Sequence, residues 1–153
     1  MIEEINSLKN IFLINLKDDE DNSLHIIICG ASNQKTPNKD ISELTGNIQN
    51  PKLAELIQGC TKVIPNYSVL YDIFFGNYFG YSVRNESYTI WDDEEKFEGN
   101  RFRIYSKSKY SDYLKISAPV TQTMEFTHYG ICCENHIIDV ASDIKPVITK
   151  IQQ

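Results

Sequence analysis

The sequence predicts an α+β fold for a single domain over residues 1–153, with a largely antiparallel β-sheet and two or three short helices. Short runs of β-branched and aromatic residues recur along the chain, and turn residues separate most of them, which is typical of about six to eight antiparallel strands. Segments with a helical spacing of apolar residues are few and short. The chain length of 153 residues is that of one domain.

The first two strands are expected at Ile11–Leu16 and Leu24–Cys29, apolar runs that flank the polar segment Lys17–Ser23. The acidic residues of this segment are not spaced as calcium ligands, because a calcium loop alternates its oxygen ligands and needs glycine and glutamate at fixed positions. A solvated hairpin tip is therefore expected there. Residues 30–51 are polar and predict a long loop, with a short turn of helix at Asp40–Leu44.

The aromatic residues gather in the middle of the chain. Val69–Phe75 and Tyr78–Arg84 predict a tight β-hairpin closed by a Gly-Asn turn, with Phe75 opposite Tyr78. Both faces of this pair are apolar, which predicts two central strands covered on both sides.

The alternation of apolar residues slips by one position across Asn85–Ser87. Apolar residues occupy odd-numbered positions up to Val83 and even-numbered positions from Tyr88 onward, and this change predicts a bulge or bend. Bulges are frequent beside functional sites, so Glu86 is a candidate functional carboxylate. The alternative is a solvated residue at a strand kink.

An acidic run, Asp92–Glu98, precedes a strand with basic residues, Arg101–Ser106. Tyr88–Trp91 and Phe102–Tyr105 are expected to pair across the acidic loop. Trp, Tyr and Arg are enriched in binding hot spots, and acidic loops attract basic partners, so this region predicts a partner-binding surface. Its expected members are Trp91, Asp92, Asp93, Glu94, Glu95, Arg101, Arg103 and Tyr105.

Helices are expected at three further places. Ser108 can cap a short helix over Lys109–Ile116, whose apolar residues form one stripe. A helix can begin at Pro51 and continue through Ile57, although the same residues could equally pair as a strand. The C-terminal apolar residues of segment 147–151 predict a short helix.

A second tight hairpin is expected from Phe126–Cys133 and His136–Ala141, with Gly130 opposite Asp139. In this register His128 is a diagonal neighbour of Asp139, and diagonal side chains can reach each other. Such a pair can serve general acid–base catalysis, or it can be a buried histidine satisfied by a carboxylate. Together with the carboxylate at the kink, the pair forms an alternative catalytic set, Glu86, His128 and Asp139.

His128, Cys132, Cys133 and His136 are not expected to bind one metal ion. The two cysteines point to opposite faces of the hairpin, and His128 lies roughly 13 Å from Cys132 along the strand, whereas zinc ligands converge. No metal and no cofactor are therefore expected. The chain also lacks a Walker loop, GxGxxG, GxSxG and HExxH.

The formal net charge of −6 argues against nucleic-acid binding and allows the protein to attract a basic partner. No apolar run approaches the ~20 residues of a membrane span. The acidic segment Met1–Glu4 lacks the basic region of a signal peptide. A soluble cytoplasmic protein is expected, with its four cysteines as reduced thiols.

Five stretches of the sequence carry a resemblance: Tyr81–Tyr88, Phe97–Gly99, Tyr105–Ser108, His128–Tyr129 and Ile138–Val140. With them, about half of the chain resembles a group of small, uncharacterised bacterial cytosolic proteins. No activity is attached to that group, so the resemblance implies no functional residues. In its small size and acidic character the chain is also similar to immunity proteins that neutralise toxins.

These observations lead to three hypotheses about function. The first is a non-catalytic protein-binding module, immunity-type or regulatory, that holds a basic partner with acidic loops and aromatic anchors. The alternative is a small-ligand-binding protein or enzyme with a pocket around Glu86, His128 and Asp139. The third is a homo-oligomer in which edge strands or aromatic side chains pair between copies.

Overall fold

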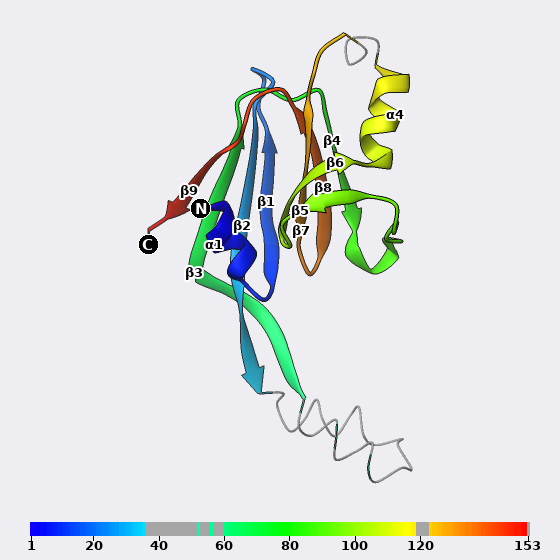
Figure 1. Ribbon diagram of the computed structural model, residues 1–153. Helices are drawn as coiled ribbons and strands as arrows, with labels where there is room; N and C mark the ends of the chain where they lie inside the picture. The colour runs from blue at the N-terminus through cyan, green and yellow to red at the C-terminus, as the bar shows by residue number, and fades with distance from the viewer. Residues whose placement is uncertain (36–51, 53–55, 57–59, 119–122, 153) are drawn as a thin grey trace.

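The computed structural model describes residues 1–35, 52, 56, 60–118 and 123–152, which are mostly antiparallel β-structure with few helices (Figure 1). Nine strands in this part of the chain form two sheets, so the strands outnumber the prediction and do not share one sheet. The first sheet contains, in spatial order, β1 (Ile11–Asp18), β2 (Leu24–Lys35), β3 (Thr61–Phe75) and β9 (Val147–Ile151). The second sheet contains β4 (Gly80–Asn85), β8 (His136–Ser142), β7 (Thr127–Cys132), β6 (Phe102–Lys107) and β5 (Lys96–Glu98).

The predicted β1–β2 hairpin is confirmed, and β2 continues to Lys35, into the segment expected to be a loop. The tip of this hairpin is predicted to be solvated, but it also forms hydrogen bonds with other parts of the protein. Asp18 accepts hydrogen bonds from the hydroxyls of Tyr78 and Tyr81, at 2.7 and 3.3 Å. Asn22, with φ of 63°, donates from its side chain to the carbonyl of Tyr78 at 3.0 Å. The tip therefore connects the first sheet to the chain that leaves β3.

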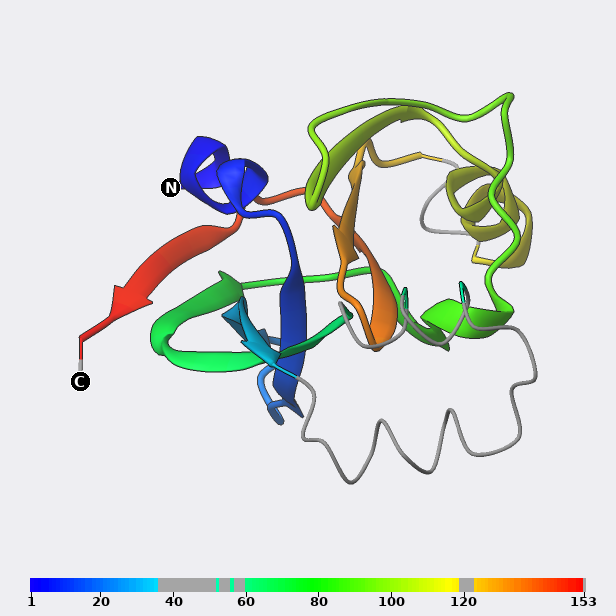
Figure 2. The ribbon, with the colours of Figure 1, turned by 90° about the horizontal axis from the view of Figure 1, so that it is seen from below.

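The predicted hairpin of Val69–Phe75 with Tyr78–Arg84 is wrong. β3 pairs with β2 along one edge and with β9 along the other, so β3 has no free edge at which β4 could pair. The connection Gly76–Phe79 carries the chain to the second sheet, where the Phe79 N–H donates to the Ala141 carbonyl and β4 pairs with β8 (Figure 2). Apolar residues on both faces indicate a central strand, but they do not select its neighbours.

The C-terminal segment forms β9 and not the predicted helix. Four of its five residues are β-branched, and such residues favour extended backbone. Ile148 lies opposite Ile73 of β3 and packs against the core. The helical turn predicted at Asp40–Leu44 lies outside the described residues. Most of the predicted helix Pro51–Ile57 does too.

The β7–β8 hairpin has the predicted register, with Gly130 opposite Asp139 and Ile131 opposite Ile138. β6 pairs with β7 on one side and with β5 on the other.

The pairing predicted between Tyr88–Trp91 and Phe102–Tyr105 is wrong, because β5 forms from Lys96–Glu98, within the acidic run itself. The slip in alternation coincides with a 3₁₀ turn, η1 (Glu86–Tyr88), and not with a bulge inside a strand. The Asn85 side chain caps this turn by accepting a hydrogen bond from the Ser87 N–H at 3.0 Å.

One hydrophobic core lies between the two sheets. Every second residue of the central strands points into it, as the alternation of the strands requires. The first sheet contributes Ile11, Leu24, Ile26, Ile28, Tyr71, Ile73 and Phe75, and the second contributes Phe102, Tyr129, Ile131, Ile138 and Val140.

Helix α1 (Ile2–Ser7) closes one end of this core with Ile5 and holds the start of β6 with Asn6. The Asn6 side-chain oxygen accepts from the N–H groups of Asn100, Arg101 and Phe102 at 2.8 to 3.0 Å, and its amide donates to the Phe102 carbonyl at 3.1 Å. Gly99, with φ of 91°, permits this approach, because a Cβ there would lie 2.8 Å from the Asn6 amide nitrogen.

Helix α4 (Lys109–Ser117) begins where the sequence predicts it. Ser108 is its N-cap, and the Ser108 Oγ accepts from the Ser111 N–H at 3.1 Å. Leu114 packs close to Gly80 of β4, so the helix covers the side of the second sheet that faces away from the core (Figure 1). None of the helices in the described ranges has the length and apolar character needed to cross a membrane.

Candidate functional site

The outer face of the second sheet, which is turned away from the core, carries an unusual set of polar side chains. Because residues alternate along a strand, the neighbours of core residues point outward. Ser82 and Arg84 reach this face from β4, Asp139 from β8 and His128 from β7, and pairing brings Ser82 and Asp139 opposite each other. A charged and polar cluster therefore lies on the outer face, the face that an antiparallel sheet can expose to water.

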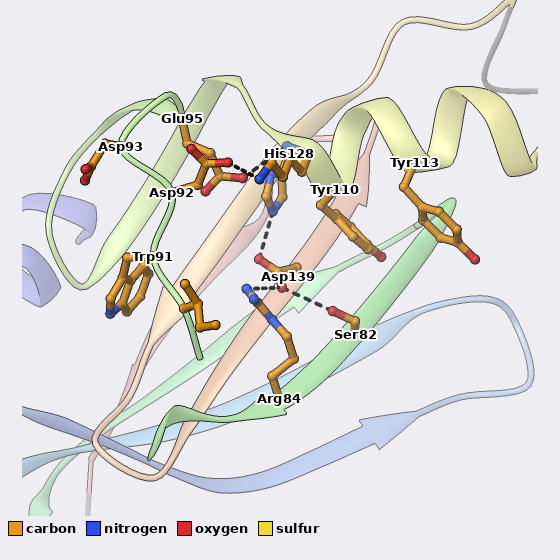
Figure 3. Close-up of a pocket in the computed structure, with 12 residues that line it drawn as sticks. Ser82, Arg84, Trp91, Asp92, Asp93, Glu95, Tyr110, Tyr113, His128 and Asp139 are labelled. Carbon is orange, nitrogen blue, oxygen red and sulfur yellow. Dashed lines mark hydrogen bonds and ion pairs between the residues drawn. The ribbon is translucent and has the colours of Figure 1, made fainter. Parts of the chain in front are cut away.

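A cavity of about 760 Å³ lies between this face, helix α4 and the chain that follows η1 (Figure 3). In the close-up, Trp91 stands on one side, Tyr110 and Tyr113 of α4 stand on the other, and Arg84 and Asp139 lie at the floor. The lining residues are Ser82, Arg84, Ile90, Trp91, Asp92, Asp93, Glu95, Lys109, Tyr110, Tyr113, His128 and Asp139.

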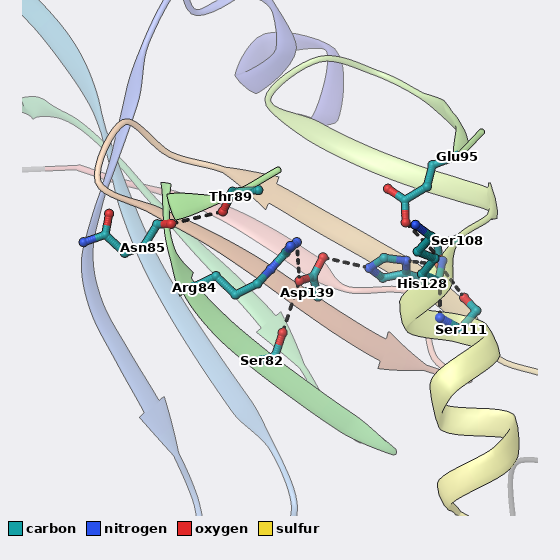
Figure 4. A network of polar contacts seen from close by, with 10 residues as sticks. Ser82, Arg84, Asn85, Thr89, Glu95, Ser108, Ser111, His128 and Asp139 are labelled. Atoms are coloured by element: carbon teal, nitrogen blue, oxygen red, sulfur yellow. Dashed lines mark hydrogen bonds and ion pairs between the residues drawn. The ribbon is translucent and has the colours of Figure 1, made fainter. Parts of the chain in front are cut away.

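A chain of polar contacts includes residues of the cavity floor and continues beyond it to Ser108 (Figure 4). The Ser108 Oγ lies 2.7 Å from the His128 Nδ1, and the His128 Nε2 lies 3.1 Å from the Asp139 Oδ1. The other carboxylate oxygen of Asp139 accepts from the Arg84 Nη2 at 2.9 Å and from the Ser82 Oγ at 3.1 Å. The diagonal contact of His128 with Asp139, inferred from the hairpin register, is thus present in the fold.

The centre of this network is buried: Ser108, His128 and Asp139 are each 2% exposed. Burial raises the pKa of Asp139, but the hydrogen bond from His128, the Arg84 charge and the Ser82 hydroxyl outweigh burial and hold that pKa below its ordinary value. Asp139 is therefore an ionised carboxylate at neutral pH, with Arg84 as its counter-ion.

Aromatic rings hold His128 on two sides. Tyr105 stacks on it with ring centroids 4.2 Å apart and an angle of 11° between the planes, and Tyr110 lies 5.0 Å away at a tilt. Gly130 makes the stack possible, since a Cβ at this position would lie 2.8 Å from the Tyr105 ring. Burial raises the pKa of Tyr110, and the Asp139 charge raises it further, so the Tyr110 hydroxyl stays protonated.

The Ser–His–Asp arrangement does not have the features of an activated nucleophile. The Ser108 Oγ is occupied as the N-cap of α4 and does not belong to the cavity lining. Both ring nitrogens of His128 are bonded within the protein, so neither is directed at a substrate in the cavity. This geometry fixes the position of Asp139, and through Asp139 that of Arg84.

The acidic segment, Asp92–Glu95, is attached by two lysines, one at the end of β6 and one at the start of α4. Asp92 forms an ion pair with Lys109, and Glu94 forms one with Lys107 at 3.3 Å. Glu95 accepts a hydrogen bond from the Lys109 N–H at 3.1 Å. The hydrogen bond from Lys109 lowers the pKa of Asp92. For Asp93, no hydrogen bond or ion pair occurs within the described ranges.

Trp91 is held by Arg103. The Arg103 guanidinium carbon lies 4.4 Å from the centroid of Trp91 and 4.0 Å from that of Phe97, so the guanidinium is stacked between two rings. Arg103 itself does not line the cavity.

The structure thus brings together some of the residues expected at a site and separates others. Trp91, Asp92, Asp93 and Glu95, expected to bind a partner, line the same cavity as His128 and Asp139, expected as an alternative catalytic pair. Three of the other expected residues contact this region without lining the cavity: Glu94, Arg103 and Tyr105. Arg101 lies elsewhere, where it binds Asn10 and Glu134. Glu86 does not line the cavity either.

Sequence reasoning did not identify Ser82, Arg84, Ile90, Lys109 or Tyr113 as residues of a site. For Ser82 and Arg84 a signal existed, because they alternate with Tyr81 and Val83 and so mark a polar face of β4. The convergence of α4 and the acidic segment over that face has no such signal, since it depends on the tertiary fold.

No metal centre is evident in the part of the chain that the structure describes, where no three His, Cys, Asp or Glu residues are placed to share an ion. Cys132 and Cys133 are buried, and burial raises the pKa of Cys132 to about 11, so this thiol stays protonated. In comparisons with family models, with curated proteins and with solved structures, the chain matches none of them.

The low pKa of Asp139 predicts an acid-sensitive contribution to stability. Because the folded state binds this proton less readily than the unfolded state, the contribution is present above the unfolded pKa of about 3.9 and is lost as the pH falls through the folded pKa. Between pH 6 and pH 3, Asp139→Asn should therefore lose less free energy of unfolding than the wild type. Urea unfolding at several pH values measures this, with Asp93→Asn as the control. Equal acid sensitivity of all three proteins would contradict the prediction.

Proposed function

We propose that this protein is a non-catalytic binding module that holds a basic protein partner at the cavity on the second sheet, in an immunity-type or regulatory role. The observation that carries the proposal is the shared location of an aromatic wall and the acidic segment around one open cavity. Aromatic anchors supply affinity at protein interfaces, and complementary charge raises the association rate.

The balance of charge around the cavity supports a basic partner. Four carboxylates and two cations line it: Asp92, Asp93, Glu95 and Asp139 against Arg84 and Lys109. Each cation is already paired with a carboxylate, Arg84 with Asp139 and Lys109 with Asp92. Asp93 and Glu95 are left with uncompensated charge, and an incoming cation could neutralise it.

Exposed apolar side chains next to the cavity support a protein as the partner. Ile90 is 92% exposed, Tyr88 is 86% exposed and Tyr113 is 62% exposed. These residues flank the cavity on the η1 side and on the α4 side, and a partner that covers the opening would remove them from water. The polar floor supports binding over catalysis, because its histidine has no nitrogen available to a substrate.

Charge reversal at the two uncompensated carboxylates tests the proposal. Protein captured from the source lysate by the wild type is compared with that captured by Asp93→Lys/Glu95→Lys and by the control Glu3→Lys, an exposed residue on α1. We expect one basic protein with the wild type and the control, in near-equal amount, and its loss with the double variant. The purified pair should then show an association rate about tenfold lower for the double variant at low salt, and less so at high salt.

Two results would contradict the proposal. One is capture of the same partner by all three proteins, followed by association rates that do not depend on the variant. The other is a captured partner that is acidic.

A further inference from the structure

We infer that the cavity accepts a guanidinium group, namely the side chain of an arginine on the partner, between Trp91 and the tyrosines of α4. This inference rests on the proposed function and specifies its ligand. It names the chemical class of the bound side chain, which the acidic charge of the cavity alone does not determine, because lysine and arginine carry the same positive charge.

The first argument is the arrangement of the cavity walls. Trp91 lines one side, and Tyr110 and Tyr113 line the other (Figure 3). A planar guanidinium stacks on aromatic faces and is weakly hydrated, whereas an ammonium group is compact and strongly hydrated. A site with aromatic side walls therefore favours arginine.

The second argument comes from the protein's own arginine. Arg103 lies between Trp91 and Phe97, with ring centroids 4.4 and 4.0 Å from its guanidinium carbon. Trp91 thus already contacts one guanidinium, that of Arg103, which does not line the cavity. The part of Trp91 that lines the cavity can contact a second group of the same kind.

The third argument is the set of hydrogen-bond acceptors. A guanidinium has five N–H donors in one plane and needs several acceptors around its edge. Asp93 and Glu95 supply carboxylates that no cation neutralises within the described ranges, and the hydroxyl of Tyr110 is a further polar atom on the opposite wall. An ammonium has three donors and would use fewer of these groups.

The floor of the cavity does not oppose a cation, although it contains Arg84. The charge of Arg84 is compensated by Asp139, which is held ionised and in place by His128 and Ser82. The floor pair is therefore neutral overall, and the charge that an entering group meets is that of Asp93 and Glu95.

Trp91 is the single tryptophan of the chain, so tryptophan fluorescence reports on the surroundings of this one cavity residue. The probes are three blocked tripeptides, acetyl-Gly-Xaa-Gly-amide, in which Xaa is arginine, lysine or citrulline. Citrulline has nearly the shape of arginine and no charge. We expect a saturable change in fluorescence with the arginine peptide, binding about tenfold weaker with citrulline because the charge-assisted hydrogen bonds are lost, and intermediate binding with lysine.

Variants identify the residues responsible. Asp93→Asn/Glu95→Gln keeps the shape of the rim and removes its charge, so it should weaken binding of the arginine peptide about tenfold, whereas Glu3→Gln should leave it unchanged. Equal affinity for the three peptides would overturn the inference. So would binding of free arginine that is much tighter than that of the peptide, because the site would then belong to a small molecule.

Failure of this inference is distinguishable from failure of the proposed function. If the peptides leave the fluorescence unchanged but the captured partner still depends on Asp93 and Glu95, the module binds its partner through another cation. If neither the peptides nor the partner depends on these carboxylates, both proposals are wrong.

Discussion

Replacing Asp139 with alanine is expected to lower the free energy of unfolding by about 2–4 kcal/mol, because it removes one acceptor that three side chains share. Asp139 accepts hydrogen bonds from His128, Arg84 and Ser82, and it is 2% exposed. Removing it leaves a buried ring nitrogen of His128 without an acceptor. Chemical denaturation at pH 7 measures the loss.

A matched control separates this effect from the simple loss of an acidic residue. Asp93→Ala removes an exposed carboxylate from the same cavity and should change the free energy of unfolding by less than about 0.5 kcal/mol. A further variant, Asp139→Asn, keeps the shape and part of the hydrogen bonding and should fall between the two. A loss of stability at Asp139→Ala no larger than that at Asp93→Ala would show that the network contributes little.

Replacing Asn6 with alanine is expected to lower the free energy of unfolding by about 2–4 kcal/mol, since three N–H groups and one carbonyl lose their partner together. These groups belong to Asn100, Arg101 and Phe102, and Phe102 is fully buried in the core. The change leaves the apolar surface of α1 in place, so the effect is specific to the polar contacts. Urea denaturation followed by circular dichroism measures it.

Asn6→Asp is the informative control for this position. A carboxylate can still accept from the three N–H groups, but it cannot donate to the Phe102 carbonyl. It should therefore retain more than half of the stability that Asn6→Ala loses. If both variants lose the same amount, the loss comes from the donated hydrogen bond and not from the three accepted ones.

The parts of the fold that sequence reasoning predicted correctly are those decided by local pattern. The register of the β7–β8 hairpin follows from alternation around a short turn, and it led to the contact of His128 with Asp139. The helix after Ser108 follows from a capping residue and a short apolar stripe. In both cases the determining residues lie within a few positions of one another.

The parts that could not be predicted depend on contacts between distant segments. β3 and β4 are adjacent in sequence and have suitable residues for a hairpin, yet they lie in different sheets because β9, from the far end of the chain, pairs with β3. Asn6 gives no signal at all, since a single asparagine in a short helix has no pattern. The candidate cavity belongs to this second class, because its walls come from α4 and the acidic segment, and only the fold brings them to one face of the sheet.

The double role of Ser108 has a mechanical consequence. The same hydroxyl oxygen caps α4 and contacts His128, so the first turn of the helix is fixed to the sheet at that point. A displacement of α4 must therefore pivot about its N-terminal end. Tyr113, which lies one turn further along than Tyr110, would move by the greater amount. The opening of the cavity could then widen for occupants of different bulk while its floor, from Ser82 to His128, kept its geometry.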